Sequence, residues 1–281
     1  MSTVYLNGEF LPKSQARVSV DDRGFLFADS IYEVCAAYSG RLFQIERHVA
    51  RMTRSLEELT IRFDPRGLVP VFERLLAENG LGEDEAAYVY AQVTRGVAPR
   101  THAFPTEPVA PTVYAYASRY QRPTPERWSE GFAAVTVPDR RWARVDVKTT
   151  NLLPNCMAAQ AAVEAGVKDA ILVKDGVALE GANNNFWAVI GGAVVTHPVT
   201  NVILPGITRE YVLGLCSSLG LNVELRPIFV EELAEAEEAF TTGTTTEVRP
   251  LVAIDGRPVG DGRVGPITRR LYEAFLEGIA A

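Results

Sequence analysis

The sequence has little positive charge and no long hydrophobic run. The formal net charge of the 281 residues is −7, which argues against nucleic acids and anionic membranes as partners, because both bind clustered positive charge. No stretch approaches the ~18 apolar residues of a membrane span, and the N-terminal segment lacks a basic region followed by an apolar core. We therefore expect a cytoplasmic protein that binds small molecules, with no nucleic acid and no membrane among its partners.

Cysteine and histidine are also scarce. The residues concerned are Cys35, Cys156, Cys216, His48, His102 and His197. Their spacing gives neither the CxxC nor the HxxxH and HxH patterns of metal sites, and three separated cysteines do not form a disulfide framework. We therefore predict buried free thiols in a reducing compartment and no metal site.

The first third of the chain has the pattern of an antiparallel sheet that carries helices. Asn7-Gly8 and Ser39-Gly40 are hairpin signals between β-rich runs. Residues 46–60 and 66–80 place apolar side chains at helical spacing, and two more β-rich runs follow them. We expect a smaller N-terminal α/β domain over residues 1–118.

A polar run with two prolines then interrupts both periodicities, and we predict an interdomain linker at residues 119–127. Beyond it, strand-like runs alternate with helical patterns. These helical patterns lie at 154–166, 208–219 and 265–279. Residues 128–281 are expected to form a larger C-terminal domain, a mixed sheet or pseudo-barrel with packed helices, so that the fold class is α+β.

Lysine occurs only at positions 13, 148, 168 and 174, and all the remaining residues among the 28 lysines and arginines are arginine. Residues 142–148 alternate polar and apolar side chains, which predicts a strand that ends at Lys148. Burial of a lysine disfavours the charged ammonium and yields the neutral amine that forms Schiff bases. From this feature alone, a surface lysine at a strand edge is the simpler interpretation.

The segment VALEGANNNFW places Glu180 after an alternating run and before three asparagines. A buried carboxylate can hold a proton on a heteroaromatic ring nitrogen and so make the ring an electron sink. The same letters also fit a solvated hairpin turn, because asparagine accepts left-handed conformations.

Two segments could bind an anion. Pro205-Gly206 and Thr208 in LPGITRE begin a predicted helix, whose unsatisfied N–H groups and positive dipole end suit a phosphate. The run TTGTTTE at 241–247 offers further hydroxyl and amide donors. Neither segment is specific, since most helix N-termini bind only a capping side chain and threonine runs are common in strands.

The segment QVTRGVAPRTHAFP places Arg95, Arg100 and His102 in a predicted loop. A guanidinium beside an imidazole suits the capture of a substrate carboxylate by charge-assisted hydrogen bonds. An exposed arginine in a loop is usually only solvated, so that this motif alone is weak.

Taken in order, these motifs resemble those of the fold-type IV pyridoxal-phosphate enzymes, and most closely those of the D-amino-acid transaminases, also called D-alanine aminotransferases. The resemblance covers nearly the whole chain. It rests on DRGFLFADSIYEV, HVARM, TRGVAPRTHAFP, DVKTTNLLPN, LEGANNNFW, THPVTNVILPGITRE, TTGTTTE and IDGRPVGDGRVG. It implies the two-domain fold of that family, pyridoxal 5'-phosphate as cofactor, and D-amino acids and 2-oxo acids as substrates.

The resemblance also implies roles for single residues. Lys148 matches the lysine that binds the cofactor as a Schiff base and moves the substrate proton, and Glu180 matches the carboxylate that faces the pyridine nitrogen. The residues that match phosphate ligands are Arg51, Ile207, Thr208 and Thr244. The residues that match the carboxylate trap are Tyr32, Arg100 and His102. In the family the Arg/His loop comes from the neighbouring subunit, which implies a homodimer whose active site both chains complete.

The chain departs from the family pattern at two places. Ala182, Asn183 and Asn184 stand where a serine run is expected, and Gly243 stands where a serine is expected. These changes leave the substrate range open. The alternatives are an (R)-amine transaminase, a branched-chain L-amino-acid transaminase, an aminodeoxychorismate lyase, and a non-enzymatic protein that binds the cofactor.

Overall fold

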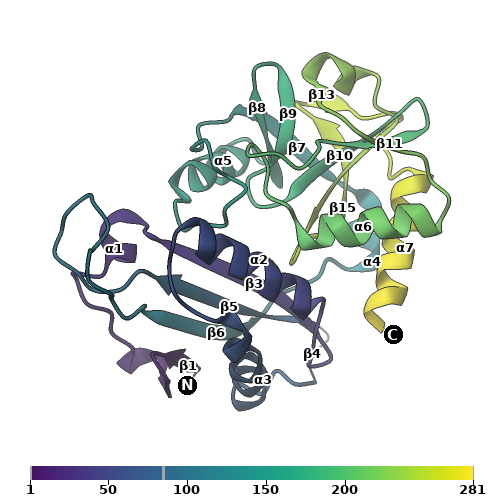
Figure 1. The fold of residues 1–281 in the computed structure, drawn as a ribbon. Coiled ribbons are helices and arrows are strands. Elements are labelled where there is room, and N and C mark those ends of the chain that lie inside the picture. Colours follow the sequence, from purple (N-terminus) through teal and green to yellow (C-terminus); the bar gives the residue numbers. More distant parts are fainter. Residues whose placement is uncertain (1, 84–85, 281) are drawn as a thin grey trace. The chain divides into compact units, whose positions relative to one another are not determined.

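The computed structural model describes residues 2–83 and 86–280 of the chain, which form two units (Figure 1). The N-terminal unit comprises the residues up to Gln121 together with Val147–Asn151. The C-terminal unit comprises Arg122–Asp146 and the residues from Leu152 onward. Each unit has its own sheet and core, as the α+β prediction requires.

The N-terminal unit contains a six-stranded antiparallel sheet with the order β2-β1-β6-β5-β3-β4. Its strands are β1 (Thr3–Leu6), β2 (Glu9–Pro12), β3 (Ser30–Tyr38), β4 (Arg41–Leu42), β5 (Ala87–Thr94) and β6 (Val113–Arg119). The predicted hairpin at Asn7-Gly8 is confirmed, since both residues have positive φ in the turn that joins β1 to β2.

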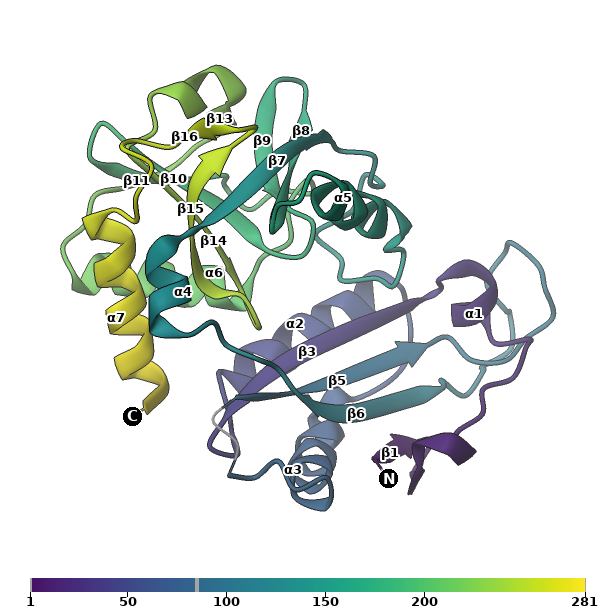
Figure 2. The ribbon, with the colours of Figure 1, turned by 180° about the vertical axis from the view of Figure 1, so that it is seen from behind.

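Two helices cover one face of this sheet, in front of it in Figure 1 and behind it in Figure 2. The helices of this unit are α1 (Arg23–Phe27), α2 (Ile45–Glu58) and α3 (Val69–Glu78), with short 3-10 turns η1 (Lys13–Gln15) and η2 (Pro65–Leu68). Leu56 of α2, Leu75 of α3, and Val89 and Ala91 of β5 belong to one buried hydrophobic core, and all four are at most 1% exposed. Burial of a leucine of this kind contributes about 1.5–3 kcal/mol.

The opposite face of the same sheet carries tyrosines at every second position, because side chains alternate along a strand. Tyr90 stacks on Tyr32 of β3 at 5.7 Å between ring centres and on Tyr116 of β6 at 5.1 Å. Neither α2 nor α3 packs there, so that the rings remain only half-buried.

The C-terminal unit contains a ten-stranded mixed sheet that closes on itself. The order β10-β14-β15-β7-β8-β9 returns to β10 through the pairing of Asn185 with Glu180, and two of these pairings are parallel. Its strands are β7 (Phe132–Pro138), β8 (Asp169–Lys174), β9 (Val177–Gly181), β10 (Asn185–Ile190), β11 (Ala193–Thr196), β12 (Val223–Leu225), β13 (Ile228–Phe229), β14 (Glu238–Gly243), β15 (Glu247–Ile254) and β16 (Arg257–Pro258). The predicted pseudo-barrel is thereby confirmed, and Glu180 lies where it closes.

The helices of the C-terminal unit pack against this barrel. They are α4 (Pro125–Glu130), α5 (Leu153–Glu164), α6 (Ile207–Ser218) and α7 (Pro266–Ala280), with a 3-10 turn η3 (Val230–Ala234). Ala158 and Ala162 of α5 pack on Leu172 of β8, and Tyr211 of α6 meets Phe275 of α7 at 5.9 Å between ring centres. The three helices predicted for this half of the chain are therefore confirmed.

The segment predicted as a linker, residues 119–127, includes the start of α4, because Pro125 suits the first helical position and the Thr124 hydroxyl caps the N–H of Arg127. One sequence prediction of secondary structure is wrong. Residues 142–148 form no strand. These residues form a turn instead, in which the polar Arg144 and Asp146 pair with each other at 2.9 Å. The N–H of Val145, which lies between them, donates to the carbonyl of Asn201.

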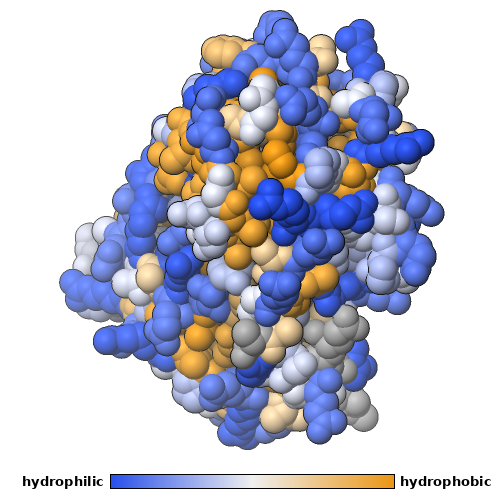
Figure 3. Space-filling view, turned by 90° about the vertical axis from the view of Figure 1, so that its right-hand side faces the viewer, coloured by the Kyte–Doolittle hydropathy of each residue, from blue (hydrophilic) through white to orange (hydrophobic). Residues whose placement is uncertain are grey.

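The surface drawn in Figure 3 is mostly hydrophilic, with apolar residues visible between the polar ones. In the part of the chain that the structure describes, no helix is both long and apolar enough to cross a membrane. The three cysteines are free, as predicted. Cys35 and Cys216 are buried, but Cys156 is exposed, so that the predicted burial is wrong for Cys156.

Candidate active site

Lys148 belongs to the N-terminal unit and is held by its backbone against β3. Its carbonyl accepts the N–H of Tyr32 at 3.0 Å, and its own N–H donates to the Ser55 hydroxyl at 3.4 Å. The next residue, Thr149, forms an isolated bridge with Ile31. The side-chain Nζ lies 4.2 Å from the ring centre of Tyr32. The backbone contacts thus aim the half-buried lysine at a residue of the predicted carboxylate trap.

Arg51 lies in a buried charged cluster between α2 and β3. It donates through Nε and Nη2 to the two carboxylate oxygens of Glu33, at 2.7 and 2.8 Å, and His48 Nδ1 lies 2.8 Å from Glu33 Oε2. Burial acts to raise the pKa of Glu33, but Arg51 and His48 outweigh it and hold this pKa well below its usual range. Burial lowers the pKa of His48, in spite of the bond to Glu33. Glu33 is therefore an anion that fixes the guanidinium of Arg51.

Glu180 is buried in the C-terminal unit and accepts hydrogen bonds on both oxygens. Oε1 accepts from Nη1 of Arg141, and Oε2 accepts from Asn185 Nδ2 at 2.9 Å and from the N–H of Leu204 at 3.0 Å. Burial raises the pKa of Glu180, an effect that Arg141 opposes. The solvated-hairpin interpretation of this segment is therefore wrong, because the side chain is only 5% exposed and has three fixed donors.

The N-terminus of α6 carries two of the predicted phosphate ligands, Ile207 and Thr208, both buried. The N-cap residue Gly206 offers no side-chain hydrogen bond, so the first N–H groups of the helix keep their capacity to bind an anion. The third, Thr244, lies in the turn between β14 and β15. This arrangement is compatible with a phosphate site within the C-terminal unit.

The two departures from the family pattern are neighbours in the structure. A Cβ atom at Gly243 would lie 3.2 Å from Cβ of Asn184 and 3.3 Å from Thr246. Asn184 is buried and donates through Nδ2 to Asp169 at 2.7 Å. The larger side chain at 184 and the missing side chain at 243 thus compensate each other in volume.

Arg100 and His102 lie in the loop between β5 and β6, which packs on α1. The guanidinium carbon of Arg100 is 5.3 Å from the ring centre of Phe27, the His102 ring is 5.7 Å from it, and Arg23 donates to the carbonyl of Thr101 at 2.7 Å. Both side chains are exposed. Among the described contacts of this unit, none joins them to Tyr32 of the same chain.

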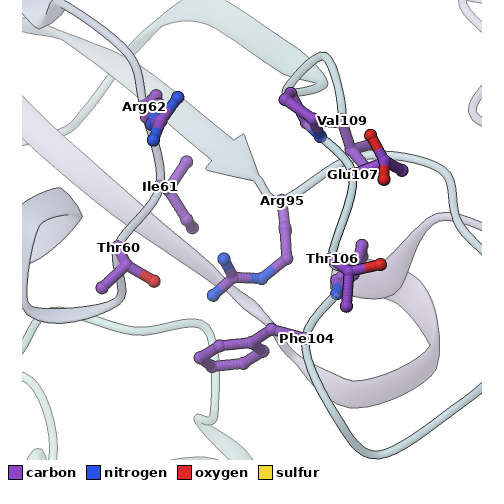
Figure 4. A pocket seen from close by; sticks show the side chains of 10 residues that line it. Thr60, Ile61, Arg62, Arg95, Phe104, Thr106, Glu107 and Val109 are labelled. Carbon is purple, nitrogen blue, oxygen red and sulfur yellow. The ribbon is translucent and has the colours of Figure 1, made fainter.

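The third residue of this motif, Arg95, has a structural role. It is buried, donates to Asp29 at 2.8 and 3.1 Å, and lies 3.6 Å over the ring of Phe104. Arg95 lines a pocket of about 270 Å³, and Figure 4 shows its side chain beside that of Phe104. Its ion pair and ring contact anchor the start of the loop that carries Arg100.

Sequence reasoning missed Glu33, His48, Asp139 and Arg141. The signals for the first two were weak: Glu33 is the one acidic residue of β3, and His48 is three residues before Arg51 on the same helix face. Asp139 and Arg141 follow β7 in a run that reads as an ordinary charged turn. No local pattern pairs Arg141 with Glu180, which is 39 residues away.

The described residues fit pyridoxal 5'-phosphate. A carboxylate offers about four acceptor positions, and the buried Glu180 uses three of them within the chain, so one remains for the N–H of a protonated ring nitrogen. The uncapped start of α6, in the same unit as Glu180, suits a phosphate group.

Comparison with known proteins agrees with this geometry. A sequence model of the family "Amino-transferase class IV" matches residues 30–254, and the chain belongs to this family. It is a pyridoxal-phosphate-dependent aminotransferase.

Among its relatives, the chain is similar to two enzymes named D-alanine aminotransferase. That of Staphylococcus haemolyticus is 42% identical over 98% of this chain and 97% of that protein. That of Bacillus licheniformis is 40% identical over 98% of this chain and 96% of that protein. Among solved structures, the branched-chain amino acid aminotransferase of Escherichia coli has a TM-score of 0.90 at 25% identity and covers 98% of this chain and 94% of that one. The fold predicted from the sequence is therefore confirmed.

Proposed function

We propose that the protein transfers the amino group of D-amino acids such as D-alanine to a 2-oxo acid, 2-oxoglutarate or pyruvate, in a ping-pong reaction. The observation that carries the proposal is the position of Lys148, whose Nζ lies 4.2 Å from the ring centre of Tyr32. The lysine expected to hold the cofactor is thus beside a residue expected to bind the substrate carboxylate. Similarity to D-alanine aminotransferases over 98% of the chain supports the choice of D-amino acids.

The cofactor, when bound, draws electrons from the substrate Cα and so makes the Cα proton acidic. Lys148 would hold the cofactor aldehyde through its amine, and the same amine, once free and neutral, would take the Cα proton as general base. Glu180 would face the ring nitrogen and favour its protonated form when the carboxylate is ionised. The residues that would hold the phosphate are Arg51, Ile207, Thr208 and Thr244.

The carboxylate trap that we propose consists of Tyr32, Arg100 and His102. Within one chain, Arg100 and His102 contact Phe27, whereas Tyr32 contacts Lys148 and Tyr90. We infer that the Arg/His loop acts on Tyr32 of a neighbouring subunit, so that a homodimer is the active form. A guanidinium that reaches a substrate carboxylate forms charge-assisted hydrogen bonds, which orient the amino acid.

Three other reactions are alternatives that the same chemistry permits. An (R)-amine has no carboxylate, so it gains nothing from Arg100 and His102. Branched-chain L-amino-acid transamination is the activity in the names of solved structures at 25–28% identity, below the 39–42% of the D-alanine aminotransferases. Release of pyruvate from aminodeoxychorismate without an amino acceptor would identify a lyase.

Attachment of the cofactor is tested by its colour and by its position in the chain. The purified protein is expected to be yellow, and borohydride followed by peptide mapping should find the cofactor on Lys148. The three other lysines, at positions 13, 168 and 174, are built-in controls. A colourless protein that pyridoxal phosphate does not reconstitute would contradict the proposal, as would label on another lysine.

The substrate is tested by comparing D- and L-alanine with 2-oxoglutarate as acceptor. We expect turnover of D-alanine. Arg100→Ala should lower kcat/KM by about 10- to 100-fold, since a hydrogen bond to a charged group contributes about 1.5–3 kcal/mol. Arg66→Ala is the matched control, because Arg66 is 81% exposed and pairs only with Asp64. Preference for L-alanine, or undiminished D-alanine turnover in Arg100→Ala, would refute the proposed specificity.

A further inference from the structure

Two buried charged side chains connect Glu180 to the end of β7. Asp139, the residue after β7, accepts from Nε and Nη2 of Arg141, each at 2.9 Å. Arg141 donates through Nη1 to Glu180, and its Nη2 also donates to the carbonyl of Val202 at 3.1 Å. All three charged side chains are only 4–6% exposed. Asp139 therefore fixes the guanidinium through two of its nitrogens, Nε and Nη2, and leaves Nη1 for Glu180.

On the basis of the function proposed above, we propose that Asp139 is a positioning residue that sets the protonation of the cofactor's ring nitrogen through Arg141 and Glu180. The hydrogen-bonded triad of Asp139, Arg141 and Glu180 contains two carboxylates and one guanidinium, so these three side chains together carry one negative charge when both carboxylates are ionised. A protonated ring nitrogen neutralises this charge. Without Asp139, the charge of Arg141 would cancel that of Glu180. No excess negative charge would then stabilise the proton on the ring nitrogen.

Two further cations near these carboxylates make the negative charge of Asp139 more important for the protonation of the ring nitrogen. Lys174 acts electrostatically on Asp139, and Arg209 acts on Glu180. Arg209 is itself buried and donates to the carbonyl of His197 at 2.8 Å. Two guanidinium groups therefore bear on the one carboxylate that is expected to face the ring, and Asp139 is the charge that offsets Arg141.

Asp139 also has the geometry and the ionisation state that this role requires. Its N–H donates to the carbonyl of Val173 on β8 at 2.8 Å, and its Oδ1 accepts the N–H of Arg141 at 2.9 Å, which fixes the turn that carries both side chains. Burial acts to raise the pKa of Asp139, but the hydrogen bonds from Arg141 outweigh it and lower this pKa, so that the residue is an anion.

The test uses holoenzyme reconstituted with pyridoxal phosphate labelled with 15N at the ring nitrogen, whose chemical shift distinguishes N–H⁺ from bare nitrogen. Asp139→Asn keeps the shape and removes the charge, and Asp139→Ser repeats the test if the Asn variant does not fold. The double variant Asp139→Asn with Arg141→Gln restores a net negative charge. Asp255→Asn is the matched control, because Asp255 accepts two hydrogen bonds from Thr136 and none from Arg141.

We expect a protonated ring nitrogen in the wild type and in the control. Asp139→Asn should lose that signal, with kcat for D-alanine lowered about tenfold or more and KM within about twofold, because only the proton-transfer step is affected. The double variant should regain the protonated signal. A protonated ring and unchanged kcat in Asp139→Asn would overturn the inference, and so would a double variant as unprotonated as the single one. Absence of cofactor on Lys148 in the wild type would instead contradict the proposed function.

Discussion

The ion pair between Glu33 and Arg51 allows a quantitative prediction of stability. The two side chains are 3% and 6% exposed, and the guanidinium meets both carboxylate oxygens at 2.7 and 2.8 Å. Glu33→Gln keeps the size of the side chain but leaves a buried guanidinium without this carboxylate. Removal of one partner from a buried pair costs about 3–5 kcal/mol, and we expect the free energy of unfolding to fall by that amount.

The measurement is urea unfolding of the apoprotein at pH 7, in wild type and Glu33→Gln. Glu57→Gln is the matched control. Glu57 lies on the exposed face of α2, the helix that carries Arg51, and a substitution there changes stability by about 0.5 kcal/mol or less. A double variant, Glu33→Leu with Arg51→Met, leaves neither charge of the pair alone and should cost less than Glu33→Gln. The reasoning is refuted if Glu33→Gln loses less than about 1 kcal/mol, or if the double variant is the less stable of the two.

Three further substitutions test other parts of the structure. Burial lowers the pKa of His48 below 6.5. At a pH below 6.5 the unfolded chain therefore takes up a proton that the folded chain does not, and the free energy of unfolding decreases. In His48→Asn, urea unfolding between pH 7 and 5 should show a smaller decrease of this free energy than in the wild type. Gly96 has a φ of 98°, and a Cβ there would collide with the carbonyl of Ala110. Gly96→Ala should therefore lower the free energy of unfolding by about 1–3 kcal/mol, and it should lower kcat/KM for D-alanine because it displaces the loop that carries Arg100. Unchanged kinetics would contradict this prediction. A Cβ at Gly206 would collide with Oδ1 of Asn185, the residue whose Nδ2 donates to Glu180. Gly206→Ala should therefore raise the Kd for pyridoxal phosphate about tenfold or more in a fluorescence titration of apoprotein, and an unchanged Kd would count against the site.

Most of the fold could be predicted from the sequence, because its elements are long and strongly periodic. The helix α2 places Met52 and Leu56 on one face, and β5 alternates buried Val89 and Ala91 with half-buried Tyr90. The prediction failed where a local residue pattern is typical of one structure but forms another. Pro125 reads as a break, although it begins a helix after its threonine cap.

The candidate site could be predicted only where it lies in contiguous motifs. Lys148, Glu180 and the start of α6 are each marked by their own neighbours in the sequence. The groups that fix them are not, because Glu33 is 18 residues from Arg51 and Arg141 is 39 residues from Glu180. Such pairs form when separate elements meet in the folded chain, and a periodicity of two or 3.6 residues carries no information about them.

The segment from Asp139 to Lys148 shows why a strand could not serve here. Asp139 and Arg141 belong to the C-terminal unit and fix Glu180, whereas Lys148 belongs to the N-terminal unit and is fixed by Tyr32. A strand would have placed these side chains along one sheet, with orientations set by its alternation. A turn closed by Arg144 and Asp146 lies between these residues instead, so the alternation of a strand does not set their orientations. The residue at the far end must also be a lysine, because arginine stays protonated near neutral pH and can neither form a Schiff base nor take a proton.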